Sequence, residues 1–367
     1  MDVIGMASWA EWDKVVNRSC FHDIYHLSSY HALAEYNGEG SPYLFIEQDG
    51  EHFIALPLLL RSLEALPFVS KASCGWLDAT SVYGYAGPIS SVPAPPAELV
   101  AKFQRELHAQ LSSMCVISAF SRLHPLMFQH PILTDLGSTV HRGQTVSIDL
   151  GISLDEQSSS FRSTFRRHIR DARRNGLTIH EDKSGEYFSA FATIYLQTMQ
   201  RVRASKYYHF SDEYFNALRE FLGHAARLFV VLHNNTVVAG ALILVENGTV
   251  QYHLGGSTQE YFHLSPMKLL IDEIRIWATE QKFRRFHLGG GVGGNADSLF
   301  YFKTGFSDIR HEFSTWRWIV NPARYRAALA CRSDWLSRNA LTNSVADYFP
   351  GYRCPTTPSA CAIFNED

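Results

Sequence analysis

The sequence predicts a mixed α/β protein made of two similarly organised halves. The chain has 367 residues, which is enough for two domains of ordinary size. Segments with the apolar alternation of strands are interspersed with segments of helical periodicity along both halves. The order of these segments in the first half returns in the second half, and this repetition indicates a duplicated domain.

The first half is expected to contain a β-hairpin, two helices and two further strands. Asp49-Gly50 lies between two apolar runs, which is a hairpin signal. Pro93–Pro96 precede the second helical pattern. In chain order, the expected elements are a helix at 28–36, strands at 42–48 and 52–60, a helix at 97–112, and strands at 115–121 and 145–150.

The second half begins with helices and continues with strands. Ser211, followed by Asp212 and Glu213, has the pattern of a helix N-cap and first turn. Pro266 suits the first position of a later helix. In chain order, the expected elements are helices at 154–175 and 185–199, a helix from 212, strands at 226–233, 236–246 and 249–254, a helix at 265–280, strands at 285–288 and 313–319, and a helix at 322–341.

Composition and charge exclude several classes of protein. The net charge is −3, so no global basic field attracts nucleic acid, although a local basic patch stays open. The longest apolar run, Phe53–Leu60, is too short to cross a bilayer. The six cysteines form no C-x-x-C pair, and the N-terminus has no signal-peptide pattern. We therefore expect reduced thiols in a cytoplasmic protein.

The most unusual segment is Leu288–Phe306, with the sequence LGGGVGGNADSLFYFKTGF. It holds five glycines within six residues, followed by Lys303 in an aromatic run. Glycines let a backbone approach another strand or a ligand closely, and a lysine among aromatic side chains needs an anion, water or a lowered pKa. The segment leaves no room for the crossover of a dinucleotide-binding motif, and no G-K-[ST] closes a phosphate loop. A structural turn with a snorkelling lysine and a functional site both remain open.

Two groups of basic residues are candidates for binding anions. Six arginines lie within residues 162–174, around the apolar stripe of a helix. Such a helix either attracts phosphates or an RNA backbone, or is a solvated face. The second group, 201–208, combines cations and phenols that suit a carboxylate or diphosphate, or forms an ordinary charged surface. His22, His26 and His31 have helical spacing but lack an acidic or thiol partner in a recognised pattern, so we expect no metal site.

Several segments share their order with a known family. They are Tyr83–Pro88 (YGYAGP), Ser121–Pro125 (SRLHP), the strand 145–150 with the basic helix 161–176, Tyr195–Tyr208 with its T-x-x-R, Gln251–Ser257 with Leu264–Pro266, and His287–Phe306 with its F-K-x-x-F. Together they span most of about residues 20–330. In this order, the chain resembles the FemABX family of aminoacyl-tRNA-dependent peptidyltransferases.

The resemblance implies two tandem domains of the N-acetyltransferase (GNAT) type, each a mixed sheet flanked by helices. The first domain would be 1–150 and the second, with the acyl-transfer site, 151–321. A helical segment at 322–345 would pack back on the first domain, and 346–367 would be a tail. Some members carry a long coiled-coil arm, but nothing within 182–280 is heptad-like enough, so the chain resembles the armless members.

The resemblance also implies a reaction. An amino group attacks the aminoacyl ester of a charged tRNA, and an amide forms without a covalent enzyme intermediate. Lys303, with its neighbour Phe302, has the catalytic position of the family, where a fixed cation stabilises the oxyanion of the transition state. The proton acceptor for the amine is left open between Asp297 and His287. No bound cofactor or metal is implied, because charged tRNA is a co-substrate.

Binding residues follow from the same resemblance. The expected substrate-binding residues are Arg201, Arg203, Lys206, Tyr207, Tyr252, Tyr85, Gly290 and Gly291. The expected tRNA contacts are Arg166, Arg170 and Arg173. The acceptor would be an amine on a cell-wall or polysaccharide precursor, nucleotide-linked or lipid-linked, or a small metabolite. A lipid-linked acceptor would be compatible with peripheral membrane contact. The lysine that binds a nucleotide-linked acceptor in some relatives has no counterpart near Glu35–Gly40, which disfavours that acceptor.

Two other functions stay open. An N-acyltransferase that depends on acyl-CoA or an acyl carrier would use the same fold. Residues 257–266 lack the glycines of the R/Q-x-x-G-x-G/A loop that cradles a diphosphate in such enzymes, which disfavours CoA. The second alternative is a non-catalytic module that binds glycans or protein partners, and the retention of Lys303 in its glycine and aromatic frame argues against it.

Overall fold

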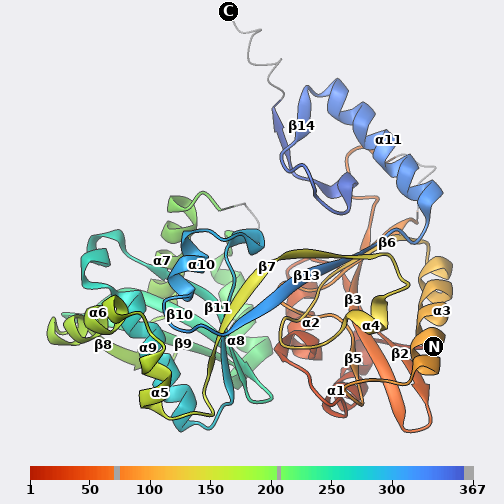
Figure 1. The fold of residues 1–367 in the computed structure, drawn as a ribbon. Coiled ribbons are helices and arrows are strands. Elements are labelled where there is room, and N and C mark those ends of the chain that lie inside the picture. Colours follow the sequence, from red (N-terminus) through yellow and green to blue (C-terminus); the bar gives the residue numbers. More distant parts are fainter. Residues whose placement is uncertain (70–74, 205–207, 359–367) are drawn as a thin grey trace, which may run out of the picture. The chain divides into compact units, whose positions relative to one another are not determined.

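The computed structural model describes residues 1–69, 75–204 and 208–358, and has the mixed α/β class that the sequence predicts (Figure 1). Contacts along the chain divide it into two compact units. Unit 1 combines residues 1–141 with the described residues from 314 onward, and unit 2 is residues 142–313. Strands β7 (Ser138–Asp149) and β13 (Arg310–Trp318) each contribute residues to both units.

Unit 1 is a sheet with the strand order β1–β2–β3–β4–β6–β13, and β5 pairs with β3. The strands are β1 (Asp2–Gly5), β2 (Ser41–Asp49), β3 (His52–Ser62), β4 (Leu77–Thr80), β5 (Ile89–Ser90), β6 (Val116–Arg122) and the end of β13. The predicted hairpin is confirmed, since β2 and β3 pair antiparallel up to Asp49 and His52. β4 and β6 pair in parallel. The chain between them contains the helix α3 (Ala97–Ser113), which forms part of the crossover that a parallel pair requires.

Two helical layers bury the sheet of unit 1. The predicted helix over 97–112 is α3 (Ala97–Ser113), and its apolar stripe of Leu99, Phe103, Leu107 and Leu111 is fully buried. A separate core forms between α1 (Trp9–Asn17) and the sheet around Trp12 and Phe53. The remaining helices of this part of unit 1 are α2 (Ser28–Tyr36), as predicted, and α4 (His130–Leu133).

The C-terminal part of unit 1 is a helix followed by a small hairpin. Its elements are α11 (Pro322–Arg338), β14 (Leu341–Asn343), the 3-10 turn η8 (Gly351–Arg353) and β15 (Thr356–Pro358). The helix ends before the expected residue 341, because Ala340 takes a left-handed conformation with φ of 50°. Asp78 of β4 is fully buried and pairs with both Arg61 of β3 and Arg353 of η8, which ties this segment to the sheet.

Unit 2 is a sheet with the strand order β7–β12–β11–β10–β9–β8. After β7, the strands are β8 (Thr178–Glu181), β9 (Ala226–His233), β10 (Thr236–Glu246), β11 (Thr249–Ser257) and β12 (Arg285–Gly289). Neighbouring strands are antiparallel except β11 and β12. The parallel pair is joined by α9 (Pro266–Glu280), the crossover helix that such a pair requires.

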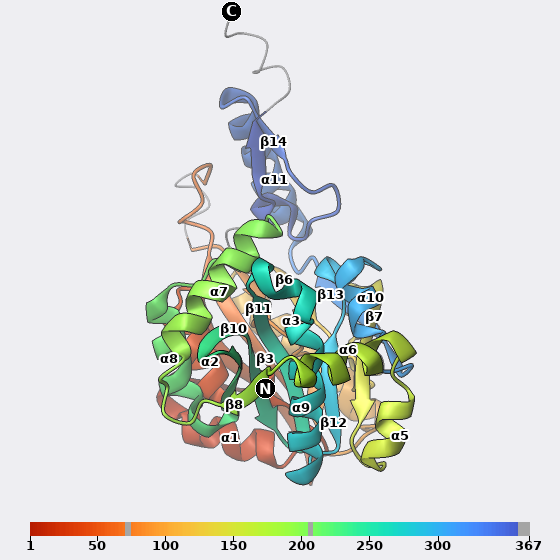
Figure 2. The same cartoon turned by 90° about the vertical axis from the view of Figure 1, so that its left-hand side faces the viewer.

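Helices cover both faces of the unit 2 sheet (Figure 2). α9 and α6 (Ser163–Arg174) pack over the apolar core around Phe286 and Leu288. α7 (Phe188–Arg201) lies on the opposite face, where a Cβ on Gly240 of β10 would be 2.7 Å from the ring of Phe191. α8 (Asp212–Leu222) begins as predicted, because the Ser211 hydroxyl accepts a hydrogen bond from the Tyr214 amide.

One predicted helix is wrong. The segment 154–175 is two helices, α5 (Leu154–Ser159) and α6, separated by an extended residue at Arg162. Phe161 turns into the core, and its ring meets Phe306 edge to face at 5.2 Å. The Arg162 amide donates to the Gly305 carbonyl at 3.0 Å instead of continuing the helix. Tertiary contacts therefore override the helical pattern of the sequence.

None of the helices in the described residues combines the length and the apolar composition that a bilayer span requires.

The buried carboxylate of Asp78 gives a prediction about the stability of unit 1. Asp78→Ala leaves two arginines at the sheet without their partner, and should lower the free energy of unfolding by roughly 3 kcal/mol. Asp347→Ala is the matched control, because Asp347 pairs with Arg317 at 2.7 Å but its side chain is 67% exposed. The control should cost less than about 1 kcal/mol. Urea unfolding followed by circular dichroism measures both, and equal losses would contradict the anchoring role.

Candidate active site

Lys303 lies where the glycine turn meets a short helix of unit 2. It is the last residue of α10 (Ser298–Lys303), and its side chain points back toward the end of β12. The ammonium donates a hydrogen bond to the Gly290 carbonyl at 2.7 Å and lies 5.7 Å from the centroid of the Tyr252 ring on β11. Only 7% of Lys303 is exposed, so this site residue predicted from the sequence is a buried lysine beside a turn.

The glycine turn is possible because its backbone approaches other backbone directly. A Cβ on Gly143 of β7 would be 1.9 Å from the Gly294 carbonyl oxygen, which no side chain can tolerate. Gly294 has φ of 91°, in the region that favours glycine. The turn leads into the six-residue helix α10 rather than into the long helix of a dinucleotide-binding motif. The glycines therefore shape the backbone around Lys303.

Asp297 holds the turn and α10 together. One carboxylate oxygen accepts a hydrogen bond from the Phe300 amide at 2.9 Å, and the other accepts one from the Val292 amide at 2.8 Å. Both oxygens are thus used by backbone donors. His287, the other residue left open as a proton acceptor, is fully buried and bonds Gln251 through Nδ1 at 2.7 Å. Because Asp297 joins the glycine turn to the helix that ends at Lys303, it is a residue that positions Lys303.

Burial sets the charge state of Lys303. Desolvation lowers its pKa to about 7, and the negative charge of Asp297 partly opposes that change. The hydrogen bond to a neutral carbonyl does not supply a full counter-charge. At neutral pH the group is therefore balanced between a cation, which can stabilise an oxyanion, and a free amine, which cannot.

Phe302 packs into an aromatic cluster below α10. Its ring lies 5.8 Å from Phe165 of α6 and 5.4 Å from Phe306. Gly305 lies under Phe165, since a Cβ there would be 2.2 Å from that ring. The cluster packs α10, which ends at Lys303, against α6. The resemblance assigns Phe302 to catalysis, and in the structure its ring packs against Phe165 and Phe306.

The remaining expected substrate residues occupy different places. Tyr252 packs against the core of unit 2, and its hydroxyl lies over Gly255, so burial raises its pKa. Arg201 at the end of α7 donates to the Ser257 carbonyl at 3.3 Å, and Arg203 follows as an exposed residue with φ of 51°. Gly291 lies against Asp297.

Three expected residues cannot be placed beside Lys303. Tyr85 belongs to unit 1, where its ring is 6.0 Å from Tyr25 and 6.2 Å from His124. Lys206 and Tyr207 lie outside the described residues. The structure therefore brings together Lys303, Phe302, Tyr252, Gly290 and Gly291, while the part played by the other residues stays a prediction.

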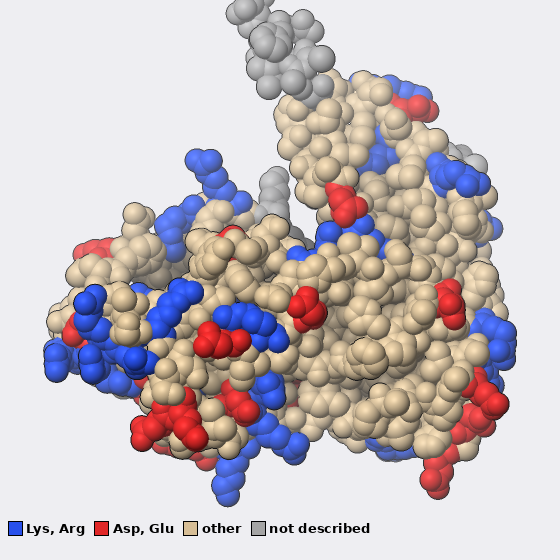
Figure 3. Space-filling model, in the orientation of Figure 1, with Lys and Arg blue, Asp and Glu red and all other residues tan. Residues whose placement is uncertain are grey.

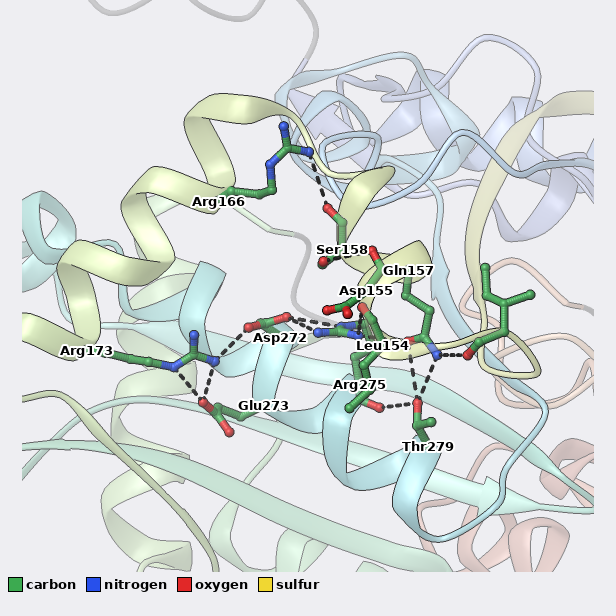
Figure 4. A network of polar contacts seen from close by, with 11 residues as sticks. Leu154, Asp155, Gln157, Ser158, Arg166, Arg173, Asp272, Glu273, Arg275 and Thr279 are labelled. Carbon is green, nitrogen blue, oxygen red and sulfur yellow. Dashed lines mark hydrogen bonds and ion pairs between the residues drawn. The ribbon is translucent and has the colours of Figure 1, made fainter.

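The three arginines expected to contact tRNA have different surroundings on α6, and Figure 4 shows two of them, Arg166 and Arg173. Arg166 donates to carbonyls at the end of α5, including Ser159 at 2.9 Å. Arg173 is paired with Asp272 at 2.8 Å and Glu273 at 2.7 Å on α9. Arg170 is exposed. Figure 3 shows Lys and Arg side chains gathered over α6. Much of the charge that the sequence assigns to RNA is therefore used within the protein.

The structure also reveals a pair that sequence reasoning missed. Lys268, in the first turn of α9, places its ammonium 2.8 Å from Nδ1 of His168 on α6. The same ammonium lies 4.8 Å from the centroid of the Phe165 ring. The two residues are 100 positions apart, so no local pattern predicts their contact. The only signal was the place of His168 inside the basic helix.

Comparisons with known proteins agree with this fold. Residues 159–303 match a family model described as an acetyltransferase (GNAT) domain. A crystal structure of FemX has a TM-score of 0.66 and 14% identity, covering 89% of this chain and 99% of that chain. The C-terminal domain of a putative lysylphosphatidylglycerol synthetase from Agrobacterium fabrum has a TM-score of 0.54 and 14% identity, covering 90% and 97%. L-PGS from Bacillus licheniformis has a TM-score of 0.54 and 14% identity, covering 88% and 96%.

No curated protein sequence matches the chain. At 14% identity the structural similarities establish the fold. The predicted GNAT-type fold is thus confirmed, and the matching domain model supports an acyltransferase.

The contact between Gly305 and Phe165 predicts how the site depends on packing. Gly305→Ala should displace the Phe165 ring and lower the free energy of unfolding by about 1–3 kcal/mol. Gly5→Ala is the control, because a Cβ there would be 3.7 Å from the Tyr43 ring, an ordinary contact. Phe165→Leu combined with Gly305→Ala should recover part of the loss, because the smaller side chain makes room. Thermal unfolding checks all three, and additive losses in the double variant would count against the contact.

Proposed function

We propose that the protein is an aminoacyltransferase that moves an aminoacyl group from charged tRNA to an amine acceptor. The observation that carries this proposal is Lys303, a buried lysine fixed beside the turn after β12 and close to Tyr252. The similarity of the whole fold to FemX and to two lysylphosphatidylglycerol synthetase structures supports it, because the latter name describes joining an amino acid to another molecule.

The chemistry requires little from the protein beyond positioning and charge. The acceptor nitrogen attacks the carbonyl carbon of the ester, the new C–N bond forms, and the carbonyl oxygen becomes an oxyanion. The C–O bond then breaks, and the released ribose hydroxyl takes a proton while the amine loses one. The Lys303 ammonium stabilises the oxyanion more than the neutral carbonyl, which lowers the barrier. An ester is already activated, so the scheme needs no covalent enzyme intermediate.

We assign the acceptor as a molecule that carries both the accepting amine and an anionic group. Arg201, Arg203, Lys206 and Tyr207 would bind that anionic group, Tyr252 would lie near the acceptor, and Gly290 and Gly291 would border the acyl group. A cell-wall or polysaccharide precursor or a small metabolite fits this description. Arg201 supports the anionic part, because its guanidinium is held by the Ser257 carbonyl and lies 4.8 Å from the centroid of the exposed Phe262 ring.

The second candidate is an N-acyltransferase that uses a CoA thioester. The matching GNAT domain model favours it. Against it, a 3-10 helix, η6 (Gln259–Leu264), with exposed Phe262 leads into α9 where a CoA-binding loop would carry glycines. The same Lys303 would serve the oxyanion of either reaction.

A donor assay distinguishes the two candidates. Purified full-length protein is given either pooled tRNA charged with radiolabelled amino acids or labelled acetyl-CoA, together with a mixture of amine acceptors. We expect label to move from tRNA into amide-linked product, and hydrolysis of the tRNA ester alone in the control without acceptor. Transfer from acetyl-CoA only would overturn the proposed function.

The pKa of Lys303 predicts a pH profile for the same reaction. Since the ammonium loses its proton as pH rises through about 7, catalysis by the cation should be strongest below that pH and decline above it. Lys303→Arg keeps its charge at alkaline pH, so the decline should disappear even if the rate is lower. Lys303→Ala should lower turnover by about 10²–10³.

Rates measured under single-turnover conditions from pH 5.5 to pH 9 check this profile, with thermal unfolding as the control for folding. Full activity of a folded Lys303→Ala protein would show that the lysine has no catalytic role.

A further inference from the structure

The Lys268–His168 pair is unusual because its ammonium faces neutral groups. Lys268 contacts the His168 imidazole at 2.8 Å, the Ser265 hydroxyl at 3.4 Å and the face of Phe165. Among the described residues, none of its contacts carries a negative charge. A half-buried lysine without a carboxylate is prepared for an anion that the protein itself does not supply.

His168 extends this cation toward the exposed side of α6. Its Nδ1 accepts a hydrogen bond from the Lys268 ammonium, so the ring proton is on Nε2, which is a second donor. Arg167 and Arg170 lie on the solvent side of α6, opposite the buried Phe165 and Ile169; both are exposed and have no ion pair within the described part of the chain. They differ in this respect from Arg173, which forms ion pairs with Asp272 and Glu273 of α9. The unpaired charge of the basic helix therefore lies on its solvent side, with Arg167 next to His168 in the sequence.

An exposed aromatic residue lies in the turn that precedes α9. Phe262 of η6 is 46% exposed, and Arg201 lies over its ring. The chain links the two features closely, since the Ser265 amide donates to the Phe262 carbonyl at 3.0 Å and the Ser265 hydroxyl meets Lys268. An exposed ring near cationic side chains such as Arg201 and Lys268 is an arrangement with which proteins hold single-stranded nucleic acid, by base stacking and phosphate contact.

These features adjoin the aromatic cluster under Lys303. Lys268 lies over the Phe165 ring, and Phe165 contacts Phe302, the residue before Lys303. A single-stranded nucleic acid bound along Phe262, Lys268 and α6 would have its end near Lys303.

We propose that Phe262, Lys268 and His168, with Arg167 next to His168 on α6, form a strip that binds the single-stranded 3′ end of an RNA donor, with a base stacked on Phe262 and a phosphate held by Lys268 and His168. This assignment rests on the proposed function and adds to it the surface that receives the donor. It places the RNA contacts on side chains that form no ion pair with a carboxylate within the described residues, rather than on Arg173, which does, and Arg166, which bonds carbonyls of α5. The shared chemistry of adenosine and phosphate also occurs in CoA, so the test separates the two sources.

The first experiment measures binding without any transfer. A fluorescein-labelled RNA oligonucleotide ending in CCA-3′ is titrated with the full-length protein, and anisotropy is recorded at 50 and 200 mM salt. Wild-type protein should bind, and binding should weaken with salt because phosphate contacts release counterions. Lys268→Met should weaken binding about fivefold to tenfold and reduce the salt slope by about one. Phe262→Ala should weaken binding by at least about fivefold, and Phe262→Trp should retain it.

Two matched controls replace residues of the same type elsewhere in unit 2. Lys183→Met removes a lysine that is 77% exposed, and Phe221→Ala removes a ring that is 36% exposed. Both should bind the oligonucleotide as the wild type does. Phe262 is exposed, so its variants test the strip even if Lys268→Met proves unstable.

The outcomes separate this proposal from the proposed function. The proposed strip would be wrong if the wild-type protein did not bind the oligonucleotide, or if Phe262→Ala bound it as tightly as the wild type does. It would also be wrong if CoA displaced the oligonucleotide at a concentration lower than that at which unlabelled oligonucleotide does. If the wild type transfers from tRNA while the strip variants keep their donor KM, the strip is wrong and the function stands. If the strip variants bind RNA more weakly but no transfer from tRNA occurs, the function is wrong and the RNA-binding surface stands.

Discussion

The arrangement of unit 2 around its site depends on keeping one ammonium out of water. Lys303 gives up most of its hydration for a single carbonyl and an aromatic neighbour, and this exchange lowers its pKa to about 7. The exchange is possible only because the glycine turn presents the Gly290 carbonyl, and the turn exists only because Gly143 and Gly294 let two backbones meet. Asp297 then accepts hydrogen bonds from one amide of the turn and one amide of α10, and these bonds fix the backbone that carries Lys303.

The sequence predicts elements well where a local signal decides the structure. The hairpin around Asp49-Gly50 and the cap at Ser211 are examples, and both are present. It fails where a distant contact decides. Phe161 and Arg162 break a helix because they meet Phe306 and Gly305, far along the chain. The same reason limits the prediction of the site: Lys303 is conspicuous within its own segment, but Lys268 and His168 become a pair only when α9 packs on α6.

The basic helix shows that a count of charges does not measure the charge available to a ligand. Arg166 closes the end of α5, and Arg173 joins Asp272, which also binds Arg275 at 2.7 Å in the interior of unit 2. Removing such residues would weaken the fold as well as any ligand contact, so a loss of RNA affinity in those variants would have two explanations. Arg167 and Arg170 allow a cleaner experiment because they are exposed on the same helix.

The discontinuous make-up of unit 1 has a consequence for synthesis on the ribosome. Residues 315–318 of β13 pair antiparallel with residues 119–122 of β6, although unit 2 lies between them in the chain. When the first 141 residues have emerged, the edge of β6 still lacks this partner, whereas unit 2 is continuous and is complete once residue 313 has appeared. The open edge of β6 is thus exposed to mispairing during the time that the ribosome needs to make unit 2. Slower elongation through this part of the message would lengthen that exposure, so the yield of folded protein is tied to the speed of translation as well as to final stability.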